Sequence, residues 1–256
     1  MLETQDLTIR FGGHVAVDRV SCTFEPGTLT AIVGPNGAGK TTWFNLISGQ
    51  LRATAGRVRL HGIDISAEGP AARTRRGIGR AFQLTQLFPA LPVRENVRLV
   101  VQSRARLGLN LWSVWRDHRG VLERTQQLLE QVRLEARADQ PAGSLPHGDQ
   151  RKLEVAMLMA LEPSVFMFDE PTAGMSVDEV PVVLDLIRQL KARTDCTILL
   201  VEHKMDVVRE LADRIVVLHN GQLVADGEPE LVIASPVVQQ AYLGAAVEPE
   251  PAGSPS

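Results

Sequence analysis

The chain has 256 residues, 44% hydrophobic and 22% charged, which is typical of one large folded domain or of a core with a subdomain. Its formal net charge of -3 argues against a general nucleic-acid-binding protein, because such proteins are usually basic. No apolar run approaches the roughly 18 residues of a membrane span, so the sequence predicts a protein that does not itself cross a membrane.

The N-terminal third is predicted to consist mostly of strands joined by tight turns, because apolar and polar residues alternate between glycine-containing turns. Residues 2–33 follow this pattern, and residues 56–83 return to short strands and turns. Between them, a glycine-rich loop at 34–39 precedes a helix from Lys40 to about Ser48.

The middle third is predicted to be helical, with helices at 93–105, 119–132 and 148–160. Because this stretch interrupts the strands, we expect an inserted helical subdomain over about 84–160. The two cysteines of the chain, Cys22 and Cys196, lie far apart in apolar stretches and are expected to be buried and reduced, as in the cytosol.

Strands return in the last third. Val165–Phe168 and 197–201 are short, continuous apolar runs, which suit strands buried on both faces, and a helix at about 177–192 separates them. Asn220-Gly221 predicts a hairpin between two further strands. Strands alternating with helices predict an α/β fold with a mostly parallel sheet. The tail over 244–256 is rich in Pro, Gly and Ser and is expected to be disordered.

The loop "GPNGAGKTT" matches the phosphate-loop pattern G-x-x-x-x-G-K-[ST]. Its glycines let successive N–H groups point at phosphate oxygens, and the helix that follows adds its positive N-terminal end. Lys40 would reach the β- and γ-phosphates, and the Thr41 hydroxyl would ligate Mg²⁺. The preceding strand and the following helix favour this interpretation over a glycine-rich turn with a chance lysine. The predicted nucleotide-binding residues here are Gly34, Pro35, Asn36, Gly37, Ala38, Gly39, Lys40, Thr41 and Thr42.

Asp169 and Glu170 end the apolar strand at 165–168. An aspartate there can hold Mg²⁺ through its water shell, and the adjacent glutamate can orient or deprotonate the attacking water. Alone, the pair would more simply solvate a strand end, but the phosphate loop favours the catalytic interpretation. ATP is favoured over GTP, because His203 stands where the guanine-reading N-K-x-D motif requires Asn.

These motifs, with "LPHGDQ" between them, resemble the nucleotide-binding subunits of ABC transporters over roughly residues 2–243. The resemblance implies a P-loop NTPase (RecA-like) core, an N-terminal antiparallel β subdomain and the inserted helical subdomain, all within 1–243. It also implies ATP and Mg²⁺ as ligands. Phe11 occupies the position of an aromatic ring that stacks on adenine. Gln83 occupies that of a glutamine that reaches the metal and the water, and His203 that of a histidine near the γ-phosphate. At Ser176 most family members have an aspartate, and this chain departs from them.

Residues 145–150, "LPHGDQ", take the place of the signature L-S-G-G-Q. In the family, two nucleotide-binding domains associate head to tail, so that this helix start faces the γ-phosphate held by the other domain. His147, Gly148 and Asp149 are therefore assigned to nucleotide binding. Pro146 replaces the family's serine and lacks both its hydroxyl and an N–H. Either this site grips ATP less tightly and is the slower of two unequal sites, or backbone N–H groups from His147 onward carry the contact.

Within the family, "RFGGHVAVDRVS", "GDQRKLEVAM" and the C-terminal sequence up to Gly244 look most like ATPase subunits of branched-chain amino acid importers. This implies two transmembrane permease subunits, a second ATP-binding subunit of the same or another kind, and an external solute-binding protein. It places the chain at the cytoplasmic face of the inner membrane. Importers of urea or amides, and ABC exporters, remain open alternatives.

Short permease helices would dock in a groove near Gln83. The residues proposed to line it are Leu84, Leu87, Phe88 and Leu91, which ordinary core packing would explain equally well. A soluble ABC ATPase of DNA repair would need long heptad coiled coils between its motifs, and these are absent.

Overall fold

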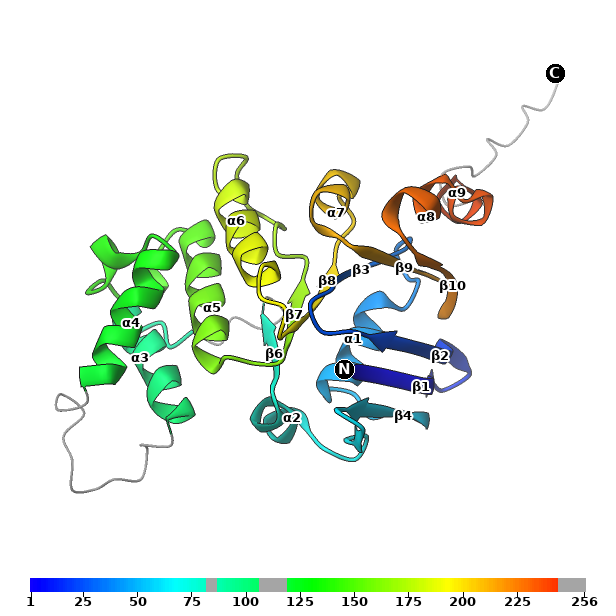
Figure 1. The fold of residues 1–256 in the computed structure, drawn as a ribbon, viewed down its shortest axis with the longest axis horizontal. Helices are drawn as coiled ribbons and strands as arrows, with labels where there is room; N and C mark the ends of the chain where they lie inside the picture. The colour runs from blue at the N-terminus through cyan, green and yellow to red at the C-terminus, as the bar shows by residue number, and fades with distance from the viewer. Residues whose placement is uncertain (82–86, 106–118, 244–256) are drawn as a thin grey trace, which may run out of the picture.

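Two β-sheets make up the strands of the protein (Figure 1). The computed structural model describes residues 1–81, 87–105 and 119–243, the side chains of 241–243 excepted. The smaller sheet is antiparallel, with the order β2-β1-β4-β5. Its strands are β1 (Leu2–Phe11), β2 (His14–Phe24), β4 (Ala55–Leu60) and β5 (Ile63–Asp64).

The larger sheet has the order β10-β9-β3-β8-β7-β6 and is parallel except for the β9–β10 hairpin. Every residue of β3, β7 and β8 is buried, as expected for strands covered on both faces. The expected parallel core, antiparallel N-terminal sheet and hairpin at Asn220-Gly221 are therefore confirmed. The strands are β3 (Leu29–Val33), β6 (Ile78–Ala81), β7 (Val165–Asp169), β8 (Thr197–Val201), β9 (Arg214–His219) and β10 (Gln222–Gly227).

Helices cover both sheets. Those of the first half are α1 (Lys40–Ser48), α2 (Pro70–Arg76), α3 (Val93–Arg104) and α4 (Arg119–Gln131). Those of the second half are α5 (His147–Leu161), α6 (Val180–Lys191), α7 (Met205–Leu211), α8 (Pro229–Ala234) and α9 (Pro236–Leu243). Helix α1 shares one apolar core with both sheets, where its Trp43 ring lies 5.7 Å from that of Phe24.

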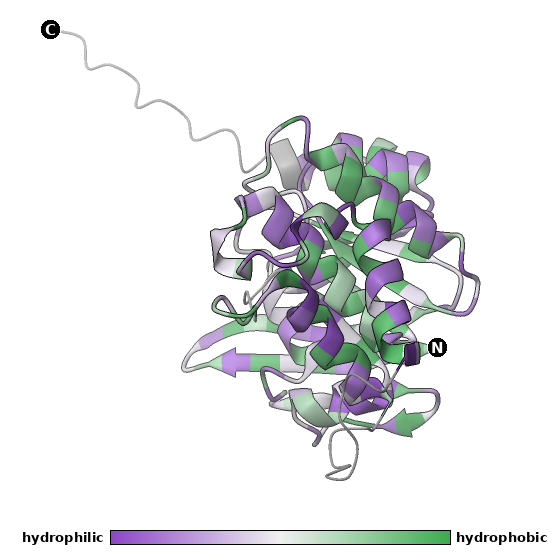
Figure 2. Cartoon of the chain, turned by 90° about the vertical axis from the view of Figure 1, so that its left-hand side faces the viewer, coloured by the Kyte–Doolittle hydropathy of each residue, from purple (hydrophilic) through white to green (hydrophobic). Residues whose placement is uncertain are grey.

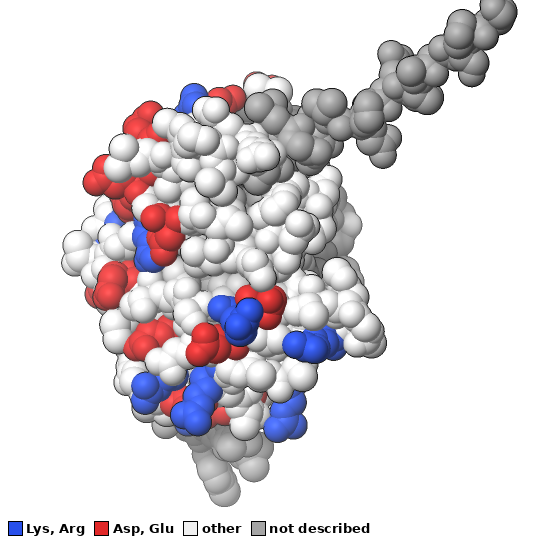
Figure 3. Space-filling view, turned by 90° about the vertical axis from the view of Figure 1, so that its right-hand side faces the viewer, with Lys and Arg blue, Asp and Glu red and all other residues white. Residues whose placement is uncertain are grey.

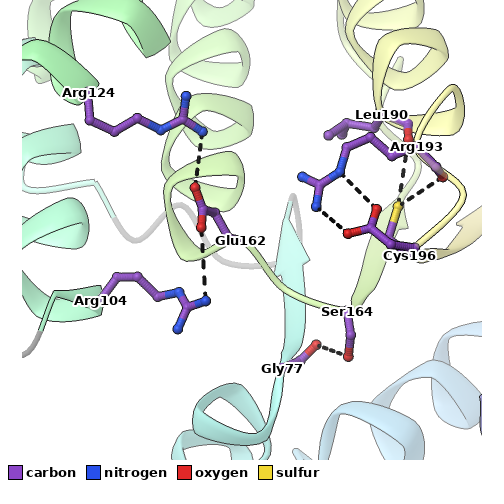
Figure 4. A network of polar contacts seen from close by, with 9 residues as sticks. Gly77, Arg104, Arg124, Glu162, Ser164, Leu190, Arg193 and Cys196 are labelled. Atoms are coloured by element: carbon purple, nitrogen blue, oxygen red, sulfur yellow. Dashed lines mark hydrogen bonds and ion pairs between the residues drawn. The ribbon is translucent and has the colours of Figure 1, made fainter.

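Helices α3, α4 and α5, here called the α3–α5 group, lie at the end of the molecule opposite the smaller sheet (Figure 1). Hydrophilic and hydrophobic residues alternate along the helices on this side (Figure 2), as amphipathic helices require. Glu162, directly after α5, ties the group together: its carboxylate lies 3.9 Å from Arg104 of α3 and 3.3 Å from Arg124 of α4 (Figure 4).

The predictions for individual helices were correct for α1 and for the α3–α5 group to within one residue at each end. The prediction of only strands and turns over 56–83 was wrong, because α2 lies there. Gly69 precedes this short helix, Pro70 starts it and Gly77 ends it in a left-handed conformation, which is a regular helix-end pattern. The Arg73 guanidinium then donates to backbone carbonyls of α1, which fixes α2 against its C-terminal end.

The predicted helix at about 177–192 begins at Val180, three residues late, because residues 177–179 form a turn closed by hydrogen bonds from Ser176 N and Oγ to Glu179 Oε2. Both cysteines are buried and free, as expected, and burial raises the pKa of the Cys22 thiol to about 12. Gln83, Leu84 and the tail 244–256, for which predictions were made above, lie outside the described residues.

A groove of about 730 Å³ lies between α2, β6 and the α3–α5 group. Leu87 and Phe88 line it, while Leu91 does not, so the expectation for this segment holds only in part.

Acidic and basic side chains are interspersed on the face drawn in Figure 3. This mixture agrees with the low net charge of the chain and contrasts with the single-sign patch of a nucleic-acid-binding surface. Among the described residues, every helix is too short or too polar to cross a bilayer.

Candidate nucleotide site

The phosphate loop connects β3 to α1 with a backbone that requires glycine. Gly34 has a φ of 150°, and a Cβ on it would lie 2.1 Å from the Leu218 carbonyl oxygen. Gly39 has a φ of 97° and caps α1, and a Cβ there would lie 2.4 Å from the Ala16 carbonyl oxygen. The loop thus packs tightly against β2 and β9 on its inner side, and its Asn36 and Gly37 are exposed on the outer side.

Lys40 lies across this loop. Its ammonium donates to the carbonyl oxygens of Gly34 at 2.6 Å and of Pro35 at 2.9 Å, and the residue is only 8% exposed. Burial lowers the pKa of Lys40, while the nearby carboxylates of Glu170 and Asp169 oppose that shift. The ammonium is therefore held at the loop, between the loop backbone and the acidic strand end.

Thr41 is exposed and Thr42 half-buried in the first turn of α1. Exposed amides and hydroxyls at a helix start suit an anion and its metal ion.

The acidic pair occupies the end of β7, which is separated from β3 only by β8. Asp169 accepts a 2.7 Å hydrogen bond from Arg80 Nη2 of β6, and both side chains are 8% exposed. Burial raises the pKa of Asp169, and Arg80 opposes that shift. Arg80 also donates to Asn45 and Ser48 of α1, so that one guanidinium links the acidic strand to the phosphate-loop helix.

Glu170 is the first residue after β7 and has a φ of 49°. Its N–H donates to the carbonyl of Val201, the last residue of β8, and this fixes the turn. Glu170 Oε1 lies 3.6 Å from His203 Nδ1, and both side chains are about half exposed. The structure therefore brings Glu170 and His203 together at one edge of the sheet, beside the phosphate loop.

Glu202 positions this histidine and was not predicted from the sequence. Its buried carboxylate accepts hydrogen bonds from Thr172 Oγ1 at 2.7 Å, from the His203 N–H at 2.9 Å and from the Lys204 N–H at 3.2 Å. The signal was present as an acidic residue directly after the apolar run 197–201. Arg80 was missed in the same way, as a lone basic residue inside the short strand β6.

Phe11 is the last residue of β1, and half of its side chain is exposed. That exposure suits a ring that stacks on a base and is unusual for a core residue.

Helix α5 begins at His147, one residue before the prediction, and Pro146 caps it with no side-chain hydrogen bond. Within the described residues, the amides of His147, Gly148 and Asp149 donate no hydrogen bond. The Asp149 carboxylate is 2.7 Å from Lys152 of α5 and 3.2 Å from Arg137, which lies between α4 and α5, so it forms ion pairs within this part of its own chain. No described contact joins these three residues to residues 34–42.

Glu179 covers Gly148. A Cβ on Gly148 would lie 2.0 Å from Glu179 Oε1, so glycine permits this close approach. The carboxylate places a negative charge beside the positive end of α5, which is a favourable arrangement. Nothing in the sequence marked Glu179 as a neighbour of this helix start.

The phosphate loop between β3 and α1, with acidic and histidine side chains at the ends of the neighbouring parallel strands, defines the protein as a P-loop NTPase. The sequence profile described as ABC transporter matches residues 17–173, which is more than half of the chain. The chain therefore belongs to the ABC transporter family, and within it to the ATP-binding cassettes, which hydrolyse ATP to drive transport.

Curated relatives agree over nearly the full length. The high-affinity branched-chain amino acid transport ATP-binding protein BraF of Pseudomonas aeruginosa is 39% identical, covering 96% of this chain and 98% of its own. LivG of Escherichia coli K12, which carries the same description, is 36% identical and covers 96% of this chain and 98% of its own. The crystal structure of the ADP conformation of MJ1267, an ATP-binding cassette of an ABC transporter, superposes with a TM-score of 0.81 at 30% identity, covering 95% of this chain and 98% of that one.

Proposed function

We propose that this chain is the ATP-hydrolysing subunit of a transporter that imports branched-chain amino acids. The observation that carries the ATPase assignment is the convergence of the phosphate loop, Asp169, Glu170 and His203 at the ends of adjacent strands. The substrate assignment is supported by BraF and LivG, whose descriptions name branched-chain amino acid transport.

The phosphate loop would bind the triphosphate of ATP through its backbone amides, and Phe11 would stack on the adenine. Lys40 would exchange its two carbonyl partners for β- and γ-phosphate oxygens, which offer a stronger, charge-assisted hydrogen bond.

The oxygen ligands near the loop fit Mg²⁺. Thr41 is exposed, and among the described residues Asp169 accepts from Arg80 through Oδ2, so Oδ1 is left for a water shell. Hydroxyl, carboxylate and amide oxygens are the ligands that this hard cation prefers. Thr41 and Asp169, together with Gln83, would hold the ion, which would neutralise charge on the β- and γ-phosphates.

Glu170 would orient and deprotonate the attacking water. Its side chain is accessible, and His203, 3.6 Å away, would contact the γ-phosphate. Glu202 keeps the His203 backbone in place by accepting its N–H. The water would thus be held between a fixed base and a fixed cradle of donors, which is how general-base catalysis becomes effective.

A second ATP-binding subunit would complete the site. The free amides of His147, Gly148 and Asp149 would face the γ-phosphate bound by that partner, and the reverse contact would form at the same time. This head-to-tail arrangement would make ATP part of the interface, so that binding closes the pair and hydrolysis releases it. The partner is either a second copy or a related chain, and in both cases it carries a phosphate loop of its own.

Two permease subunits would anchor the protein at the cytoplasmic face of the membrane, and an external solute-binding protein would deliver the substrate.

We also propose that residues 84–160 form a helical subdomain inserted in a cassette that spans 1–243. No contact with nucleic acid is proposed.

Uptake of radiolabelled leucine, isoleucine and valine by cells with and without this subunit tests the proposal. We expect uptake to fall to background without it and to return with the wild-type gene, but not with Lys40→Ala. Unchanged amino-acid uptake would overturn the substrate, and assays with urea, amides and efflux substrates would then find the replacement.

A further inference from the structure

The buried side chain of Arg80 joins two elements that lie far apart in the sequence. From β6, its Nη2 donates to Asp169 Oδ2 at 2.7 Å, at the end of β7. Its Nη1 donates to Asn45 Oδ1 at 2.6 Å and to Ser48 Oγ at 2.9 Å, both on α1. A third acceptor of Nη1, at 3.3 Å, is Gln50 Oε1, just after α1. The two terminal nitrogens of one guanidinium therefore hold the Asp169 carboxylate at a fixed distance from α1.

The geometry of the guanidinium makes this connection rigid. The group is planar, so the orientation of Nη1 on α1 sets that of Nη2 on β7. Its Cζ also lies 4.9 Å from the centre of the Phe44 ring of α1, within the range of a cation–π contact. Nε has no acceptor among the described residues, so the terminal nitrogens and the ring determine where the group lies. Arg80 therefore fixes the conformation of Asp169 relative to α1, in addition to balancing its charge.

The two elements that Arg80 joins carry the groups proposed to bind Mg²⁺. Thr41 lies in the first turn of α1, and Asp169 is the last residue of β7. Strand β8 separates β7 from β3, so the sheet does not connect β7 directly to the phosphate loop. Arg80 occupies Oδ2 of Asp169 and leaves Oδ1 for the water shell of the ion. Hydrogen-bond partners orient metal-binding side chains, and their loss typically lowers metal affinity or activity by about 10–100-fold.

We propose that Arg80 is a positioning residue for ATP hydrolysis, because its bonds to α1 hold Asp169 Oδ1 within reach of the water shell of a metal ion bound at Thr41. The inference rests on the proposed function for the roles of Thr41 and Asp169, and it adds the residue that sets their separation. Since Arg80 and the water shell use different oxygens of one carboxylate, Arg80 keeps its place when the site is filled. Without Arg80, the Asp169 side chain would be free to turn away from α1.

Arg80→Lys separates positioning from simple neutralisation of a buried carboxylate. Lysine keeps the positive charge but offers one ammonium on a flexible stem, which cannot hold Asp169 and α1 in one fixed geometry. Arg73→Lys is the matched control, because Arg73 is also buried and donates to carbonyls of α1, but it is not bonded to Asp169. Urea unfolding of each full-length variant shows whether it is folded.

The measured quantity is a metal ratio, defined as the dissociation constant of a fluorescent, non-hydrolysable ATP analogue in EDTA divided by that in Mg²⁺. We expect Arg80→Lys to lower this ratio roughly tenfold, which is the lower end of the range for such partners, with no change of affinity in EDTA. Arg73→Lys should leave the ratio unchanged. Turnover of ATP by Arg80→Lys should require more Mg²⁺ for half-maximal rate.

A double variant, Asn45→Ala with Ser48→Ala, removes two acceptors on α1 and keeps the charge pair between Arg80 and Asp169. Positioning predicts a lower metal ratio here as well, whereas neutralisation alone predicts no change. If the ratio stays at the wild-type value in either Arg80→Lys or the double variant, while Asp169→Asn lowers it, the inference is overturned and the proposed metal site stands. If Asp169→Asn also leaves the ratio unchanged, the proposed role of Asp169 fails instead.

Discussion

The phosphate loop and the start of α5 are both helix N-termini with glycines, but the rest of this chain surrounds them differently. Around the loop, parallel strands of one sheet bring Lys40, Asp169, Glu170 and His203 together. Around the start of α5, three amides have no described acceptor, and Glu179 is the acidic neighbour. In the proposed function, the loop has its catalytic groups within its own chain, whereas the start of α5 binds an anion that a second domain brings.

The largest effect is expected for Glu170, one of the groups that lie beside the phosphate loop. Glu170→Gln should lower ATP turnover by about 10²- to 10⁴-fold, the usual contribution of a general base, and leave ATP binding intact. Because bound ATP would then persist, size-exclusion chromatography with ATP should show a trapped dimer. Turnover at the parental rate would remove Glu170 as the base. Glu123→Gln, far from the sheet edge, should behave as wild type.

Gly148→Ala tests the role proposed for the start of α5. The added methyl would meet Glu179 and would stand between the α5 amides and an approaching phosphate. We expect ATP-dependent dimerisation to weaken by roughly tenfold, or about 1.4 kcal/mol, with no change in ATP binding by the isolated chain. Gly120→Ala on α4 is the control, because a Cβ there meets nothing within 4 Å. If both variants dimerise equally well, the α5 start does not face the nucleotide.

Glu202→Gln tests whether His203 depends on the buried carboxylate of Glu202 for its position. The glutamine oxygen would still accept from the two N–H groups and its nitrogen would donate to the Thr172 hydroxyl, but these hydrogen bonds would no longer be charge-assisted, so the free energy of unfolding should fall by about 1–3 kcal/mol in urea titrations. Turnover should fall further than ATP affinity, since His203 is held less firmly. Glu230→Gln, an exposed change on α8, should alter neither quantity. A loss of stability with normal turnover would separate Glu202 from the site.

The smallest effect is expected at Pro146, which caps α5 without a side-chain hydrogen bond. Pro146→Ser restores a hydroxyl, and a hydrogen bond to a charged group contributes about 1.5–3 kcal/mol. With the permease and partner subunit present, the ATP concentration for half-maximal turnover should fall by roughly tenfold, which corresponds to the lower end of that range. An unchanged value would mean that the amides from His147 onward carry the contact alone.

Local sequence patterns predicted those elements whose signals are local. The apolar runs gave β3, β7 and β8, and the glycine pattern of residues 34–39 located the phosphate loop, because a strand, a turn and a helix start each depend on a few adjacent residues. Helix α2 escaped prediction because its seven residues contain no large apolar side chain and its anchor, Arg73, bonds to carbonyls of α1 that are distant in sequence.

The sequence by itself determined the family, the phosphate loop and the identity of the acidic and histidine groups, since each is a short motif with its own chemistry. Only the tertiary structure decided that Arg80 pairs with Asp169, that Glu202 holds His203 and that Glu179 covers Gly148. The physical reason is that a hydrogen bond or an ion pair depends on distance in space, and packing of the sheets and helices sets that distance for residues far apart in the chain.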